Sequence, residues 1–338
     1  MKLSSLLVPF LVVVSGALAQ AQAQATHGQA PQSKCEMLQA DRQWIESAVR
    51  NWTIAERKLL RLRPSPLPTI VVVDRACGYV APSRPDRALR WTATPHPGTV
   101  TLPDGNAVPV GVMSFAAPIG DRDKAGFFVM SLPSVWREQN VASPLGLEAL
   151  MDGVLLHEMA HTRQFYFANP ALEALTRKYG LPEDIHDDSL QEAFKGNANY
   201  VAEYERERDL LYAAALSPSD AEAKRLATEA LKAMRTRRAT WFKGANEKWA
   251  PLDEVFLTME GLGQWIIYAW FTDPAGRKLD QQSALEFIRR KRSHWSQDEG
   301  LALFLAVDRL VPNWQAHAFA KEPATAERLL EMAAGAVR

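Results

Sequence analysis

Hydrophobic residues recur at helical spacing between residues 41 and 63. One stripe of this segment is formed by Trp44, Ile45, Ala48, Trp52, Ala55, Leu59 and Leu62. The spacing predicts an amphipathic helix that buries this stripe. Prolines occupy positions 64, 66 and 68. Because proline cannot continue a helix, we expect the helix to end before them.

Short runs after this helix are typical of β-strands. Residues 70–73 are β-branched, and strand-like patterns follow at 99–102, 108–115 and 127–132. Turn-forming residues at 104–106 and 118–120 separate some of these runs. From about Pro144 onwards the spacing is helical almost throughout. Strands that come first and helices that come later predict an α+β fold and not alternating βαβ units.

The first residues have the three regions of a signal peptide. Lys2 precedes an apolar run at 6–14, and residues 17–19 have the small-x-small form that signal peptidase accepts. We therefore predict a signal peptide at 1–19, a flexible mature N-terminus at 20–33 and a periplasmic or secreted protein. The apolar run is too short for a stable anchor, so we expect none after cleavage. An uncleaved anchor is the alternative.

The predicted export bears on the redox state of the two cysteines. Cys35 and Cys77 are the only cysteines in the chain. In an oxidising compartment we expect them to form one disulfide, which would join the segment after the leader to the end of the first predicted strand. Two buried free thiols are the alternative. Because the cysteines are far apart and no CxxC motif occurs, we do not expect a thiolate zinc site.

Composition excludes some partners. The chain has 338 residues, and 47% of them are hydrophobic, which is enough to bury a substantial core. Lys and Arg total 39, and so do Asp and Glu, so the formal net charge is zero. Without a basic excess, nothing in the composition favours nucleic acid.

The segment His157-Glu158-Met159-Ala160-His161 has the spacing of a zinc site. Histidines at i and i+4 lie one turn apart on one helix face, so both imidazoles can reach a single metal ion. Glu158 would lie beside the metal and act on a water molecule as a general base. The surrounding helix is apolar, and unpaired imidazoles and carboxylates are costly there. Two helix histidines that bond each other or the backbone are the alternative.

These residues, together with Val154 and Thr162, resemble the extended motif of the zincin metallopeptidases. The glycine and third histidine of the metzincin branch are absent, so the third ligand should be a carboxylate from a later helix, as in the gluzincin branch. The resemblance implies a zincin-like catalytic domain with a β-rich part at 34–143. The helical part at 144–338 would carry the histidine helix and the third ligand.

Several later carboxylates are candidates for the third zinc ligand. Glu205 and Asp209 form an ExxxD pair, but the alternating charges around them are typical of a solvated face. Glu203 and Glu207 share a stripe with apolar residues. Carboxylates there need a partner, so these two are candidate ligands or hydrogen-bond acceptors for the histidines. A surface pair is the alternative.

Glu260 is our preferred third ligand. It is the only charged residue in the segment 255–272, so its carboxylate must meet a cation or become protonated. A protonated or tyrosine-bonded core glutamate is the alternative. Gly261 and Gly263 would let the backbone approach another helix closely. The segment 260–265 also resembles the Glu-Gly-x-Ala-x-aromatic helix of gluzincins of the aminopeptidase N type, in which that glutamate is the third ligand. An inserted helical hairpin at about 182–249 would explain the long separation from His161.

The sequence thus predicts a hydrolase that binds Zn²⁺ through His157, His161 and Glu260 and acts on a peptide or protein. Strand 127–132 precedes the histidine helix, as the substrate-binding edge strand does in zincins, and this resemblance implies that it could bind an extended peptide by backbone pairing. The candidates for stabilising an oxyanion are Tyr200, Tyr204, Tyr268, His186 and His294. Two alternatives stay open: a non-catalytic exported protein with a structural metal or histidine pair, and a zinc hydrolase of non-peptide amides or esters.

Overall fold

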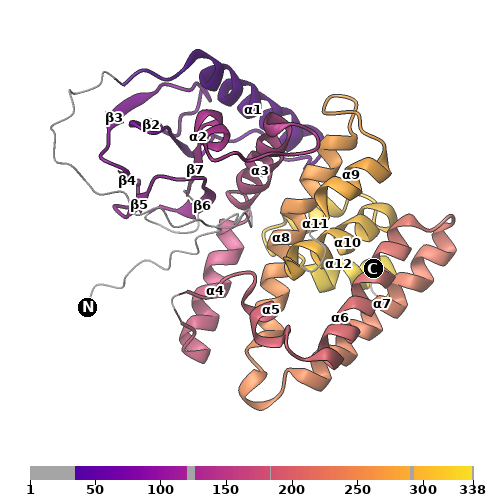
Figure 1. The fold of residues 1–338 in the computed structure, drawn as a ribbon. Coiled ribbons are helices and arrows are strands. Elements are labelled where there is room, and N and C mark those ends of the chain that lie inside the picture. The colour runs from indigo at the N-terminus through magenta and orange to yellow at the C-terminus, as the bar shows by residue number, and fades with distance from the viewer. Residues whose placement is uncertain (1–34, 120–125, 183, 290–292, 337–338) are drawn as a thin grey trace.

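The computed structural model describes residues 35–119, 126–182, 184–289 and 293–336. The predicted signal peptide and the predicted flexible segment at 20–33 lie outside these residues. A small mixed sheet comes first in the chain and helices dominate the rest, so the fold is α+β as predicted. In Figure 1 the sheet lies beside α1, α2 and α3, and most later helices form a separate layer on the other side of α3.

The main sheet has the strand order β3-β2-β1-β7-β6. Its strands are β1 (Thr69–Val73), β2 (Cys77–Ala81), β3 (Thr92–Pro95), β6 (Ser114–Pro118) and β7 (Gly126–Ser131). Strands β1 and β7 run parallel, and the other neighbouring strands run antiparallel. A separate hairpin pairs β4 (Thr99–Thr101) with β5 (Ala107–Pro109). The predicted turn at 104–106 connects these two strands.

The structure corrects several predicted boundaries. The single strand expected at 108–115 is two strands in different sheets: β5 pairs with β4, and β6 pairs with β7. Strands β2 and β3 were not predicted. The strand expected at 127–132 is β7, and it lies between β1 and β6, so it is not an edge strand. Helix α1 (Gln39–Lys58) ends before the prolines, and Arg61 has a φ of 55°, which no helical residue adopts.

Both faces of the central strand β1 are buried. Ile70 and Val72 of β1 pack in the core that includes α1 and α3, whereas Val71 and Val73 pack in a second cluster with residues of the β4–β5 hairpin. A strand buried on both faces has apolar residues in a continuous run, not in alternation. This is why residues 70–73 form an unbroken β-branched segment.

The helices account for most of the chain. They are α2 (Pro133–Glu138), α3 (Leu147–His161), α4 (Phe165–Tyr179), α5 (Ser189–Phe194), α6 (Ala198–Leu216), α7 (Asp220–Trp241), α8 (Trp249–Thr272), α9 (Gln281–Ile288), α10 (Trp295–Leu310), α11 (Trp314–Ala318) and α12 (Ala326–Ala334). Helices α6 and α7 pack as a hairpin within the expected segment 182–249. Helix α3 packs against the sheet and α1, and also against α8, so it joins the two parts.

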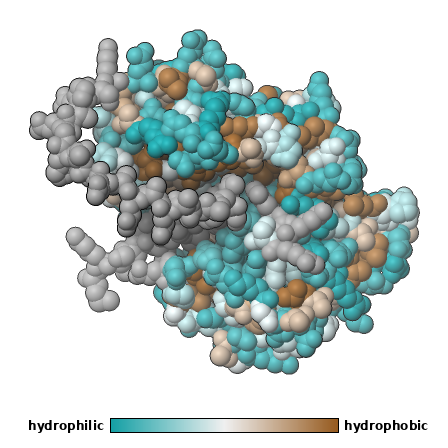
Figure 2. All heavy atoms as spheres, in the orientation of Figure 1, coloured by the Kyte–Doolittle hydropathy of each residue, from teal (hydrophilic) through white to brown (hydrophobic). Residues whose placement is uncertain are grey.

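The surface fits a folded domain with a polar exterior. On the face shown in Figure 2, hydrophilic residues predominate and hydrophobic ones form separate patches. Among the described residues, no helix is both long and apolar enough to cross a membrane.

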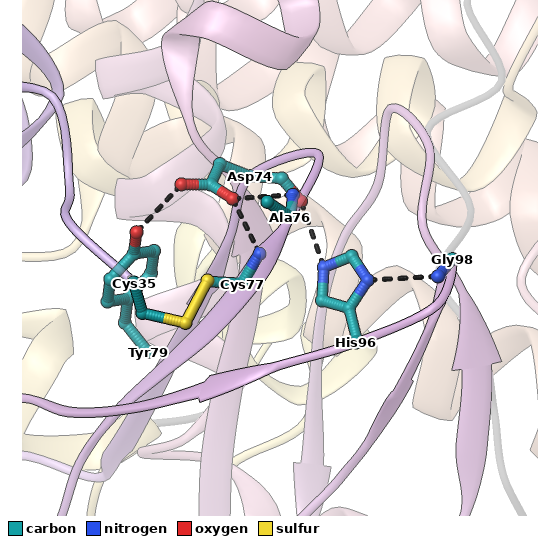
Figure 3. The surroundings of a disulfide bond; sticks show 7 residues. All are labelled: Cys35, Asp74, Ala76, Cys77, Tyr79, His96 and Gly98. Atoms are coloured by element: carbon teal, nitrogen blue, oxygen red, sulfur yellow. Dashed lines mark hydrogen bonds between the residues drawn. A yellow bond between two sulfur atoms is a disulfide. The ribbon is translucent and has the colours of Figure 1, made fainter. Parts of the chain in front are cut away.

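A disulfide joins Cys35 to Cys77, as predicted. Figure 3 shows Cys77 beside Asp74, whose carboxylate accepts hydrogen bonds from the backbone N–H groups of Ala76 and Cys77 and from the Tyr79 hydroxyl. Cys77 begins β2, so the bond lies one strand later than we expected. Disulfides are typical of oxidising compartments, which agrees with an exported protein.

We expect the double substitution Cys35→Ser, Cys77→Ser to lower the free energy of unfolding by about 2–4 kcal/mol, because the disulfide constrains the unfolded chain. The two cysteines are 42 residues apart. Denaturant unfolding with and without a reductant measures the loss. A reductant should lower the free energy of unfolding of the native protein by the same amount and leave that of the double variant unchanged. Equal stability of all four samples would contradict this role.

Candidate metal centre

The two motif histidines lie on the last turns of α3, in the interior of the protein. His157 is 6% exposed, Glu158 1% and His161 0%. The helix is apolar around most of its circumference because the sheet, α1 and α8 all pack against it. In this setting the three polar side chains need partners or a metal ion.

Glu260 of α8 lies directly opposite the histidines. Its Oε2 is 3.2 Å from Nε2 of His157, and its Oε1 is 3.3 Å from Nε2 of His161. The two Nε2 atoms are 2.9 Å apart. All three residues are buried, and together they form a group that could hold a metal ion.

The spacing of these atoms suits a small divalent cation. Zinc binds imidazole nitrogen at roughly 2.0–2.1 Å, so ligand atoms at tetrahedral corners lie about 3.3 Å apart. The separations of 2.9, 3.2 and 3.3 Å are close to this value. Two histidines and one carboxylate also form a ligand set found in catalytic zinc sites, in which a fourth position stays open.

Gln164 sets the tautomer of His161. Its Nε2 donates to the carbonyl oxygen of Thr258 at 3.1 Å, so its Oε1 must be the atom that faces His161 at 2.8 Å. Since this oxygen can only accept, Nδ1 of His161 donates a hydrogen bond to it, and Nε2 is the ring nitrogen that faces Glu260 and His157. This is the arrangement that metal ligation by Nε2 needs.

A second amide holds the Glu260 carboxylate in place. Nε2 of Gln297, on α10, donates to Oε2 of Glu260 at 3.0 Å. Nε2 of Gln264 in turn donates to Oε1 of Gln297 at 2.8 Å. These outer glutamines were not predicted. The only signal for them in the sequence was that Gln164 and Gln264 lie within a helical turn of the proposed ligands.

The glycines of α8 allow the close packing that we predicted. A Cβ on Gly261 would lie 2.8 Å from Cα of Gly300, so α8 and α10 touch backbone to backbone there. A Cβ on Gly263 would lie 2.6 Å from Nδ1 of His157. Gly263 therefore makes room for the imidazole ring.

We expect Gly263→Ala to reduce metal occupancy strongly, because the new methyl group would displace the His157 ring. Zinc content after dialysis, measured with the free energy of unfolding, tests this. Gly196→Ala is the matched control, since a Cβ there would meet no atom within 4 Å. Equal zinc content in the two variants would show that the ring position does not matter.

Glu158 projects from the same helix toward β6. The backbone N–H of Ala116 donates to its carboxyl group, and its Oε2 is buried with no hydrogen-bond partner among the described residues. Burial raises the pKa of Glu158 to about 8; the charge of His161 opposes this rise, and that of Glu260 adds to it. A carboxyl group with this pKa can take up and release a proton near neutral pH.

The residues of this group influence each other's charge. Burial opposes ionisation of Glu260, but the two histidines outweigh it and hold the pKa of Glu260 well below its usual range. Burial likewise opposes charge on His161, but Glu260 raises the pKa of His161 to about 9. Burial also raises the pKa of Asp187 to about 6, and the charge of Glu260 contributes. Asp187, which we did not predict, therefore lies within electrostatic reach of the centre.

The other predicted carboxylates lie elsewhere. Glu207 is buried, and its two oxygens accept from Arg237 at 2.7 and 3.1 Å. Oε2 of Glu203 accepts from the indole N–H of Trp241 at 3.0 Å. Among the described residues, neither belongs to the group that could hold a metal with the two histidines. The physical reason is that a buried arginine on α7 supplies the charge partner that Glu207 needs.

Four of the five candidates for stabilising an oxyanion have other partners. Tyr200 accepts a hydrogen bond from Arg237, and the hydroxyl of Tyr204 donates to the carbonyl oxygen of Trp295. Nδ1 of His294 lies 2.7 Å from Asp188, and Nε2 of His186 lies 3.5 Å from Glu192. Burial raises the pKa of Tyr268.

No family model matches this chain, and no curated protein or solved structure shows significant similarity to it.

Proposed function

We propose that this chain is a zinc-dependent hydrolase with a zincin-like catalytic domain, and that its substrate is a peptide or protein. The observation that carries the proposal is the convergence of His157, His161 and Glu260 in the interior, with Glu158 beside them. A structural metal site would not need an unpartnered carboxylate next to its ligands. Glu158 Oε2 has no partner among the described residues, which supports a role for this carboxylate on a substrate or water.

Each residue has a separate role in this mechanism. His157, His161 and Glu260 would hold the metal, with Gln164 and Gln297 fixing the ligand atoms. A bound zinc ion would supply Lewis acidity to the scissile carbonyl and to water at the site. Glu158 would accept a proton from the attacking water and pass it to the leaving amine.

Strand β6 is the better candidate for binding an extended substrate. It is the edge strand of the main sheet on the side of α3, and Ala116 of this strand contacts Glu158. An extended peptide could add to this edge by backbone hydrogen bonds and would then run past the general base. This replaces β7, which the sheet encloses.

The test combines metal content with activity. The purified mature protein should contain about one zinc ion per chain, cleave a mixed peptide library and lose this activity on treatment with a chelator. Zinc should restore it. A panel of non-peptide amides and esters, assayed in parallel, separates the peptidase from other zinc hydrolases. Stoichiometric zinc without hydrolysis of any substrate would favour the non-catalytic alternative.

A further inference from the structure

A pocket of about 250 Å³ lies between α3, α8 and α9 and has no role in the mechanism above. Its walls are mostly apolar and include Leu150, Val154, Ile267 and Phe287. The loop that precedes α3 closes another side. Three polar residues also line it, namely Ser143, the exposed Glu286 and Gln264, and of these Gln264 is 2% exposed.

The pocket and the metal centre share the same groove between two antiparallel helices. Gly263 faces His157, and one turn away Gly153 faces Ile267, so α3 and α8 run in opposite directions. On α3, Val154 precedes His157 by three residues, a spacing that puts both on one face. On α8, Gln264 follows Glu260 by four residues, so these two side chains also share one helix face. The metal ligands therefore lie at one end of the groove and the pocket one to two turns further along it.

The amide of Gln264 has a fixed orientation with an unused acceptor. Gln297 must donate to the Glu260 carboxylate, which leaves Oε1 of Gln297 to face Gln264. Gln264 must then present its Nε2 to Gln297. Its own Oε1 is buried and has no hydrogen-bond partner among the described residues. A buried amide oxygen without a partner is costly, so a ligand that donates a hydrogen bond here would be favoured.

We propose that this pocket binds the side chain of a substrate residue next to the cleaved bond and selects an aromatic ring with an N–H or O–H donor. Tryptophan and tyrosine are the residues with this chemistry. Their rings match the apolar walls, and the indole N–H or phenol O–H would donate to Oε1 of Gln264. That the ligand is part of a substrate rests on the proposed function. That it carries an aromatic ring with a donor rests on the residues of the pocket alone.

The first experiment measures binding without catalysis. Calorimetry with the zinc-loaded mature protein compares N-acetyl-tryptophanamide with N-acetyl-phenylalaninamide, which lacks the ring donor. We expect about threefold to tenfold tighter binding of the tryptophan amide, the range of one net hydrogen bond. Leu150→Trp fills the pocket and should abolish this difference. Leu216→Trp makes the same change at a site that is 53% exposed at the end of α6, and should preserve it.

The second experiment measures kcat/KM for peptides that differ only at the residues flanking the cleaved bond. Tryptophan and tyrosine peptides should exceed the phenylalanine peptide by about threefold to tenfold, and Leu150→Trp should lower this ratio. If Leu150→Trp does not fold, as judged by circular dichroism, Ala142→Trp on the exposed rim narrows the same pocket.

The outcomes separate the two proposals. The proposal for the pocket is overturned if the native protein binds the two amides equally, or if a folded pocket variant keeps the preference. Cleavage of peptides without any preference for these rings also overturns it and leaves the hydrolase intact. The third outcome is a protein that cleaves no peptide but binds the tryptophan amide selectively, with Leu150→Trp abolishing this selectivity. It supports the pocket as a ligand site and overturns the peptidase proposal.

Discussion

Replacing Glu158 by Gln should reduce kcat by roughly 10²- to 10⁴-fold while the protein keeps its fold and its metal. The reason is that Glu158 lies beside the candidate ligands but is not one of them, and a general base contributes mainly to the transition state. Glutamine has the same size and can still accept a hydrogen bond from the N–H of Ala116. Steady-state kinetics and metal analysis on the same preparation measure both quantities.

The control for this variant is Glu148→Gln, on the exposed first turn of the same helix. It should retain native activity and zinc. If Glu158→Gln is as active as this control, Glu158 is not the general base and the proposed mechanism is wrong. If Glu158→Gln instead loses its zinc, the carboxylate acts as a ligand and the assignment of Glu260 needs to be revised.

Replacing Glu260 by Gln should remove most of the bound zinc with little change in helix content. The amide keeps the size of the side chain and loses the negative charge that faces Nε2 of both histidines. His161→Ala should also lose zinc, and in both variants the free energy of unfolding should fall, because metal binding contributes to folding. Metal content after dialysis and thermal unfolding with and without added zinc test this.

Glu203→Gln is the matched control, since its carboxylate bonds Trp241 and not the histidines. It should keep its zinc. Glu207→Gln should also keep zinc but lower the stability of the apo and zinc-bound forms alike, because it weakens the buried pair with Arg237. Retention of zinc by Glu260→Gln together with loss of zinc in Glu207→Gln would contradict the assignment of the ligands.

Zinc binding should weaken as the pH falls. A ligating imidazole must be deprotonated at the bound nitrogen, and Glu260 outweighs burial to raise the pKa of His161 to about 9. Protons therefore compete with the metal, and zinc uptake releases them. Zinc affinity measured by competition with a chelator should rise with pH through the neutral range. A pH-independent affinity would mean that the histidines do not bind the metal.

Local patterns were sufficient for those parts of the fold and site that depend on neighbouring residues. The i, i+4 spacing of His157 and His161 puts both on one helix face whatever surrounds them. The apolar run around them predicted a buried helix, and the structure contains it. The disulfide followed from a single pair of cysteines, which leaves no choice of connectivity.

Local patterns predicted the ends of the strands and helices, and the order of the strands in the sheet, less well. Residues 127–132 are apolar because both faces of β7 are packed, but an edge strand with packed faces has a similar pattern. The buried residues of β6 are an example of this. Only strand pairing shows which of the two is at the edge, because hydrogen-bond partners far away in the sequence decide it.

The choice among the glutamates shows where sequence stops being informative. Glu207 and Glu260 both interrupt apolar helical stripes, and the sequence by itself determined that each needs a buried partner. It also determined the two histidines and the carboxylate between them, since helix geometry sets their relative positions. Only the tertiary structure decided that Arg237 faces Glu207 and that the histidines face Glu260. The physical reason is that a charge partner is supplied by packing between helices far apart in the chain, and periodicity within one helix carries no information about which helix lies opposite.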